Sequence, residues 1–134
     1  MFRKPKTPAM PLFEYAVLRV VPRVEREEFL NVGVILFCPA QGFLQAKFEL
    51  NEARLLAFAR AQLDLADLHT RLHSFERICG GRATGGPIGQ LAIASRFRWL
   101  TAQRSTVVQT SAVHPGLCED AGATLARLFV ELVA

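Results

Sequence analysis

The sequence predicts an α+β fold, in which a mainly antiparallel sheet of three to four strands packs with about three to four helices. The first observation is a series of segments rich in Val, Ile, Leu and Phe within the first 50 residues, as in strands. The second is a change after residue 51 to apolar residues that recur every three or four positions, as in amphipathic helices. A third is another helical pattern at the end of the chain. Separate blocks of strands and helices are typical of α+β domains.

The predicted strands span residues 13–21, 29–38 and 43–50. A charged connection joins the first two, and the Pro-Ala-Gln-Gly sequence at 39–42 predicts a tight turn between the last two. Gly42 suits the positive φ that such a turn requires. Since both connections are short, we expect an antiparallel meander.

Alternation along these strands assigns their even-numbered residues to one apolar face, which we expect to pack on helices. That face comprises Leu18, Val20, Leu30, Val32, Val34, Leu36, Leu44, Ala46 and Phe48. The opposite face combines apolar residues with polar ones such as Arg19 and Asn31. A register symmetric about Glu25 would place Arg19 opposite Asn31 and Val17 opposite Gly33.

Two helices are predicted between residues 51 and 80. Asn51 and Asp64 are favourable N-cap residues, and each precedes an apolar stripe with helical spacing. The glycine pair at 80–81 should end the second helix.

Three further elements are predicted in the second half of the chain. Residues 88–95 favour a short helix, and residues 106–109 favour a fourth strand. A last amphipathic helix should begin at about Asp120. Its expected buried residues are Leu125, Leu128, Phe129 and Leu132.

The length of 134 residues suits one domain, which we expect to span residues 12–134. Residues 1–11 form a basic segment that we expect to be a disordered tail. Of the net charge of +4, three positive charges belong to Arg3, Lys4 and Lys6, which leaves +1 for the rest. Net charge therefore gives little reason to expect nucleic-acid binding.

The cysteines and the apolar segments indicate a cytoplasmic protein. Cys38, Cys79 and Cys118 are odd in number and widely spaced, which favours reduced thiols. The sequence lacks a secretory apolar region and the run of about 20 apolar residues that spans a bilayer. His114 and Cys118 stand four residues apart, but the Pro-Gly pair at 115–116 disfavours a helix there. We therefore expect neither a metal site nor a catalytic thiol, and we expect no cofactor.

The most unusual feature is a stretch without acidic residues between Glu76 and Glu119. Five arginines lie within it: Arg77, Arg82, Arg96, Arg98 and Arg104. Serine and threonine accompany them, and guanidinium groups beside hydroxyls suit a phosphate or carboxylate. Arg19, in the middle of an apolar strand, is a second unusual cation. We take as candidate binding residues Arg19, Asn31, Arg96, Arg104, Ser105, Thr106 and His114.

A structural role for these arginines is the alternative hypothesis. They would then pair across the fold with one of four acidic residues, namely Glu25, Glu27, Glu28 or Glu49. Arg19 in particular would form an ion pair with Glu28 or bind Asn31. A binding role predicts that Arg104→Ala weakens binding with little loss of stability, and a structural role predicts the reverse.

Two sequence blocks resemble a bacterial family. They are residues 15–37, YAVLRVVPRVEREEFLNVGVILF, and residues 97–116, FRWLTAQRSTVVQTSAVHPG. With the Asn-Glu-Ala-Arg run at 51–54, they resemble the domain-of-unknown-function family DUF3037 over residues 12–134. The resemblance highlights Arg19, Glu28, Asn31, Gly33, Arg54, Trp99, Arg104, Ser105, Thr106 and His114. It implies no established activity, catalytic residue or cofactor.

We therefore expect a non-catalytic interaction or regulatory module with an arginine-rich surface for an anion or an acidic partner. Because members of the family are often encoded beside a HipA-like kinase, the resemblance implies such a kinase as a protein partner. An enzyme or nucleotide-binding protein acting on a phosphorylated substrate is the first alternative, and a nucleic-acid-binding protein is the second. The apolar residues on the odd-numbered sheet face suggest a homodimer as well.

Overall fold

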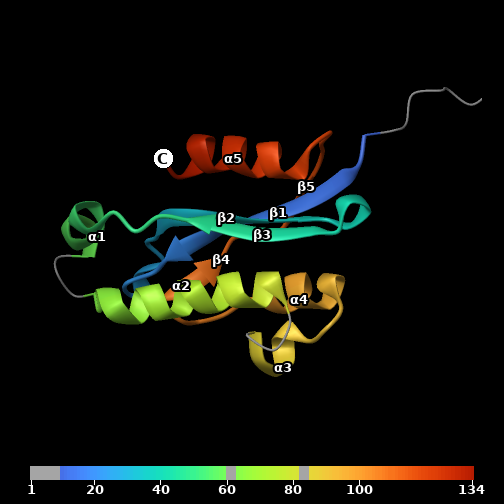
Figure 1. The fold of residues 1–134 in the computed structure, drawn as a ribbon. Coiled ribbons are helices and arrows are strands. Elements are labelled where there is room, and N and C mark those ends of the chain that lie inside the picture. Colours follow the sequence, from blue (N-terminus) through green and yellow to red (C-terminus); the bar gives the residue numbers. More distant parts are fainter. Residues whose placement is uncertain (1–9, 60–62, 82–84) are drawn as a thin grey trace, which may run out of the picture.

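The fold is that of a computed structural model, which describes residues 10–59, 63–81 and 85–134. It is the predicted α+β fold, with a mainly antiparallel sheet between two helical layers (Figure 1). One layer is the last helix, and the other contains the helices from the middle of the chain. The expected disordered tail lies outside the described residues up to position 9.

Three strands form the predicted antiparallel meander. They are β1 (Leu12–Val20), β2 (Leu30–Cys38) and β3 (Phe43–Phe48). The short 3-10 helix η1 (Val24–Arg26) lies in the first connection, and η2 (Pro39–Gln41) lies in the second. Gly42 has the expected positive φ, at 57°.

Two more strands extend the sheet beyond β1. The predicted fourth strand is β4 (Val108–Thr110), slightly displaced along the chain, and β5 (His114–Leu117) follows it. Both pair antiparallel with β1, so the sheet order is β3-β2-β1-β4, with β5 beside the start of β1. β5 was not predicted, because its central Pro-Gly pair is typical of turns.

The register between β1 and β2 confirms one predicted pair of opposed residues and corrects another. Arg19 lies opposite Asn31 as predicted, but Val17 lies opposite Val34 and not opposite Gly33. The register shifts between Leu18 and Arg19, where β2 contains an extra residue. The backbone approaches closely here, since a Cβ on Gly33 would lie 2.6 Å from the carbonyl oxygen of β3 residue 47.

This bulge changes which β2 residues share a face. The even-face prediction is correct for β1, β3 and the start of β2, but it is wrong for Val34 and Leu36. They lie on the opposite face, whereas Ile35 and Phe37 join the predicted core. A one-residue insertion has this effect because side chains alternate along a strand.

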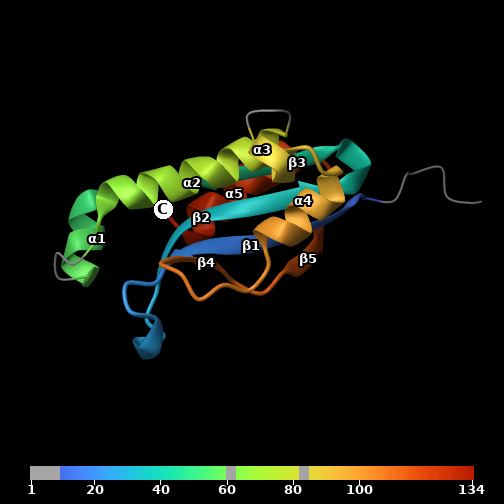
Figure 2. The ribbon, with the colours of Figure 1, turned by 90° about the horizontal axis from the view of Figure 1, so that it is seen from below.

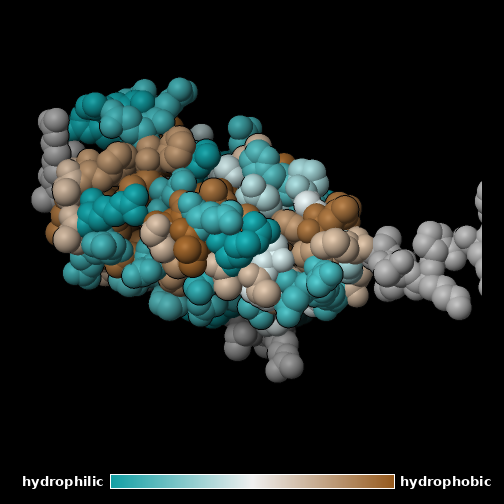
Figure 3. Space-filling model, turned by 90° about the horizontal axis from the view of Figure 1, so that it is seen from above, coloured by the Kyte–Doolittle hydropathy of each residue, from teal (hydrophilic) through white to brown (hydrophobic). Residues whose placement is uncertain are grey.

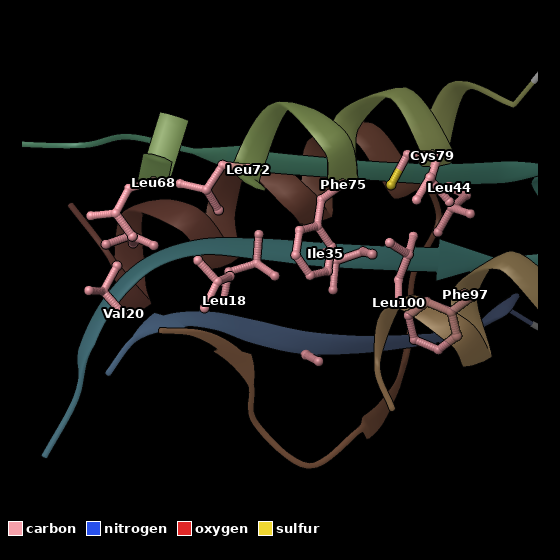
Figure 4. Close-up of a cluster of buried hydrophobic side chains, with 14 of the residues drawn as sticks. Leu18, Val20, Ile35, Leu44, Leu68, Leu72, Phe75, Cys79, Phe97 and Leu100 are labelled. Carbon is pink, nitrogen blue, oxygen red and sulfur yellow. The ribbon is translucent and has the colours of Figure 1, made fainter. Parts of the chain in front are cut away.

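The larger core lies between the sheet and two helices, α2 (Leu65–Gly80) and α4 (Ile93–Leu100). Figure 4 shows Leu18 and Ile35 of the sheet facing Leu72 and Phe75 of α2. Phe97 of α4 is fully buried at one end of the cluster. The burial of these apolar side chains is the main favourable contribution to the stability of the domain.

The second core lies under α5 (Ala121–Leu132), which packs on β2 and β3. Leu125, Leu128 and Phe129 are buried there as predicted, whereas Leu132 is only partly buried. The sheet face that suggested a homodimer is thus covered by the chain's own helix. Over α5 the surface combines hydrophilic and hydrophobic side chains (Figure 3).

The helix boundaries follow the predicted caps. The side chain of Asn51 accepts a bond at the start of α1 (Glu52–Ala59), as Asp64 does for α2 and Asp120 for α5. Gly81, with φ 73°, ends α2. The predicted helix at 88–95 is wrong, because the chain forms α3 (Gly86–Gly89), breaks, and forms α4.

The structure also bears on thiols, metals and membranes. Cys38, Cys79 and Cys118 are all free and buried. The described residues contain no group of three or more His, Cys, Asp or Glu side chains that could hold a metal ion. Within the same part of the chain, the helices are too short or too polar to cross a membrane.

Candidate anion-binding cleft

A cleft of about 530 Å³ lies at the side of the sheet where β4 pairs with β1. Its walls come from β1, the η1 connection, the chain between α4 and β4, and β4 itself. Figure 2 shows the η1 connection and the start of β4 close together at the end of β1. The polar lining residues are Arg19, Glu27, Gln103, Arg104, Ser105, Gln109, Thr110 and Ser111.

Arg19 reaches this cleft because of its place on β1. Leu18 and Val20 point into the larger core, so alternation turns Arg19 to the other face. On that face α5 packs on β2 and β3, which leaves the end of β1 open. The Arg19 guanidinium lies 3.9 Å above the centre of the Phe29 ring. This contact stabilises a cation through the quadrupole of the ring.

Arg19 has no structural ion pair in the described part of the chain. The expected partner, Glu28, instead accepts a bond from Arg26 Nε at 2.6 Å. Asn31 lies opposite Arg19, but its side-chain amide donates to the Leu132 carbonyl at 3.2 Å. The Nε atom of Arg19 is buried and has no hydrogen-bond partner. The prediction of an ion pair with Glu28 or a bond to Asn31 is therefore wrong.

Arg104 enters the same cleft from the end of α4. Its guanidinium donates to the carbonyls of Trp99 at 2.7 Å, Leu100 at 2.7 Å and Ala102 at 3.2 Å. It also lies 4.7 Å from the Trp99 ring centre. Burial lowers the pKa of Arg104. The cation thus closes the C-terminal end of α4, where positive charge is favourable, and it faces the cleft as well.

Hydrogen bonds made by residues in and next to β4 hold the cleft wall in place. The Ser111 hydroxyl accepts from the Val17 amide at 2.8 Å. Thr106 Oγ1 donates to the Val108 carbonyl at 2.8 Å, so this predicted site residue braces the wall and does not line the cleft. Thr106 and Ser105 are both exposed, but of the two only Ser105 lines the cleft.

The remaining candidate residues lie elsewhere. Arg96 donates to the carbonyls of Ile78 at 2.9 Å and Cys79 at 2.7 Å, so it closes the end of α2. His114 is exposed on β5, where its ring lies 5.4 Å from that of Tyr15. Asn31 belongs to a separate pocket of about 260 Å³ near the C-terminal end of α5.

The arginines of the acid-free stretch therefore have different partners. Arg98 forms an ion pair with Glu14, with bonds of 2.6 and 3.0 Å, and this bonding raises the pKa of Arg98. Arg77 donates to Ser74, and Arg96 and Arg104 donate to carbonyls. Arg82 lies outside the described residues. None of the four acidic residues proposed as distant partners bonds to an arginine of this stretch in the described structure.

Sequence reasoning missed Glu27 and Phe29 as cleft residues. The backbone of Glu27 has a left-handed conformation, with φ 56°. The Glu27 side chain lines the cleft and carries the opposite charge to Arg19. The sequence did contain a signal for Phe29, since this large apolar residue directly follows a highly charged connection. The placement of Glu27 depends on how the η1 connection folds over β1, which local patterns do not reveal.

The charged residues of the cleft can bind an anionic group. Arg19 and Arg104 present guanidinium groups, which bind carboxylate or phosphate through paired N–H donors. The volume of the cleft falls in the range of about 300–1,000 Å³ that is usual for ligand sites. Glu27 restricts the ligand, because its carboxylate repels anions on one side.

Comparison with protein families matches residues 15–133 to DUF3037, which is described as a protein of unknown function. The match covers nearly the whole chain. No curated protein and no solved structure matches the sequence.

Proposed function

From the residues of this chain, which belongs to the family of unknown function DUF3037, we propose that it is a non-catalytic interaction module whose cleft binds an anionic group of a protein partner. The observation that carries this proposal is the Arg19 guanidinium. It lines the cleft, its buried Nε atom has no partner, and the nearby Arg104 adds a second cation. A charged donor without a carboxylate partner favours an incoming anion, since unpaired buried donors are costly.

The apolar rim of the cleft favours a protein partner over a free metabolite. Val24 and Phe29 line the cleft and remain 41% and 44% exposed. Trp99, which stacks on Arg104, is 42% exposed. Aromatic and arginine side chains are enriched where proteins bind each other. The partner segment should thus combine an acidic or phosphorylated side chain with an apolar neighbour.

A nucleotide or another small phosphorylated substrate is the second candidate, and the cleft volume favours it. Nucleic acid fits less well. A phosphate backbone needs an extended row of cations, whereas Glu27 places a negative charge in this cleft.

As the protein partner to test first, we propose a HipA-like kinase, which the family resemblance suggests. We also propose that the module works in the bacterial cytoplasm, where its unpaired, buried thiols would stay reduced. Co-expression with such a kinase should give a stable complex that Arg19→Met weakens. A complex of unchanged affinity would contradict use of this cleft.

The proposal is tested by calorimetric titration of the wild type, Arg19→Met and Arg127→Met. The last variant is the matched control, because Arg127 is exposed on α5 and pairs only with Glu131 among the described residues. The probes are a capped peptide of alternating Glu and Phe, inorganic phosphate and ATP. We expect the peptide to bind the wild type and the control equally, and Arg19→Met at least about tenfold more weakly, or about 1.4 kcal/mol.

The other outcomes separate the alternatives. Tight binding of ATP without binding of the peptide would support the nucleotide-binding candidate. Equal binding of the peptide to all three proteins, or no binding to any, would contradict the proposed function.

A further inference from the structure

The β3 strand leaves one side of its backbone unpaired. The Glu49 amide donates to the Val32 carbonyl at 2.8 Å, and the β2–β3 register continues without a shift. In an antiparallel ladder, backbone groups turn alternately toward and away from the partner strand. The N–H and C=O groups of Leu44, Ala46 and Phe48 therefore point to the outer edge. The described residues provide no other strand beside this edge.

A groove of about 510 Å³ follows this edge, and α2 forms its other wall. On the strand side it is lined by residues 41–46, and on the helix side by Glu76, Cys79 and Gly80. Since α2 packs against β3, the edge lies beside the helix and not on a flat surface. Figure 1 shows β3 at the outer edge of the sheet with α2 alongside.

The opposite edge of the sheet, formed by β4 and β5, is less suited to pairing with another strand. There β4 has three residues, and β5 contains Pro115, which has no N–H to donate. Short strands and proline are devices that prevent further strand pairing. The six residues of β3 include neither proline nor a bulge.

The position of α2 decides between two occupants of the edge. A second copy of this chain, paired strand to strand, would bring its own α2 toward the first. Paired strands lie about 4.8 Å apart, whereas packed helices need about 8–10 Å. A single extended segment without a covering helix meets no such obstacle.

The charges of the groove specify this segment further. Glu76 is the acidic residue that lines the groove. Its side chain is exposed, and Glu76 Oε1 lies 3.7 Å from His73 Nδ1. Burial raises the pKa of the Cys79 thiol to about 12, so this wall carries no thiolate at neutral pH. Arg96 lies near but is held by two carbonyls at the end of α2. A basic side chain facing α2 therefore complements the groove.

We propose that the edge of β3 and the end of α2 form a docking groove for an extended segment of a partner protein, which adds as a strand and places a Lys or Arg beside Glu76. In this mode, main-chain bonds hold the segment and alternate side chains select it. The groove lies at the β3 edge of the sheet and the cleft with Arg19 lies at the β4 edge, so this interaction goes beyond the proposed function.

The test uses a capped hexapeptide in which valine alternates with lysine, and a second peptide with glutamate in place of lysine. At millimolar concentration, the lysine peptide should slow hydrogen exchange of the amides of Leu44, Ala46 and Phe48. The glutamate peptide should bind at least several-fold more weakly, and Glu76→Lys should reverse this preference. Binding of the lysine peptide without protection of these three amides would overturn the proposal.

Ala46→Pro tests the main-chain bonds directly. Proline removes an outward N–H and is tolerated on an edge strand, so the far-ultraviolet circular dichroism should be unchanged while binding is lost. Ala46→Val, which keeps the N–H, is the control and should bind. Arg19→Met should bind as well, which separates this groove from the cleft. Equal binding by Ala46→Pro, or dimerisation of the wild type that Ala46→Pro abolishes, would contradict a single-segment docking site.

Discussion

Replacing Arg19 by methionine distinguishes an arginine that binds a ligand from one that stabilises the fold. Methionine keeps an unbranched apolar chain over the Phe29 ring and removes only the guanidinium. The variant therefore loses one cation–π contact and one buried donor without a partner.

The two effects have opposite signs. An unsatisfied buried donor costs about 1–3 kcal/mol, and a cation–π contact contributes about 0.5–2 kcal/mol. The free energy of unfolding should thus change by between a loss of about 1 kcal/mol and a gain of about 2.5 kcal/mol. If Arg19 belonged to a buried ion pair, removing it would cost about 3–5 kcal/mol.

Urea unfolding followed by the fluorescence of Trp99 measures this difference, because the chain contains one tryptophan. Arg127→Met, on the exposed face of α5, controls for the loss of a positive charge. A loss of more than about 3 kcal/mol in Arg19→Met alone would show that the guanidinium has a structural partner, and it would refute the reasoning.

Four further predictions follow from the geometry. Arg104→Ala should lose about 1.5–3 kcal/mol in urea unfolding, because it removes charge-assisted bonds to the carbonyls at the end of α4; an unchanged midpoint would contradict this. Asp120→Ala should cost about 1 kcal/mol by the same assay, whereas Asp120→Asn, which keeps the cap oxygen, should cost less. Gly33→Ala should destabilise by about 1–3 kcal/mol, since its Cβ would overlap β3, and a neutral result would exclude the close approach. The raised pKa of Cys79 should contribute stability below pH 9 that is lost as the pH rises toward 12, so Cys79→Ala should show a shallower alkaline loss in unfolding titrations.

Replacing Arg104 by alanine does not separate binding from stability, as the sequence alone suggested it would. The sequence suggested that a binding arginine would leave stability nearly unchanged on replacement by alanine. Because Arg104 closes α4 and lines the cleft, its substitution should affect both properties. Arg19 is the cleaner probe of the cleft for this reason.

Local signals predicted most of the fold. Asn51, Asp64 and Asp120 cap helices as expected, because a cap depends on residues three positions apart. The register beyond Gly33 could not be predicted in this way. Its bulge arises where the β3 backbone approaches Gly33, which is a contact between strands and has no local pattern.

The candidate site was predictable to a similar extent. The acid-free stretch predicted that Arg104 and Ser105 lie near Arg19, and all three residues line the same cleft. Arg96 and His114 lie outside this cleft, Arg96 bonded to backbone carbonyls at the end of α2 and His114 beside the Tyr15 ring. Sequence composition shows which charges lack nearby carboxylates, but it does not show which carbonyls the fold will bring to them.

The central claim is that the Arg19 guanidinium binds an anionic group of the partner, and the Nε–H signal of Arg19 in a nitrogen-15 correlation spectrum tests it most directly. Adding the capped peptide of alternating Glu and Phe should shift this signal, because an anion bound to the guanidinium changes the environment of the buried Nε–H, while the Arg127 signal stays unchanged. A peptide that binds without moving the Arg19 signal, or that moves both signals equally, would contradict the proposed cleft.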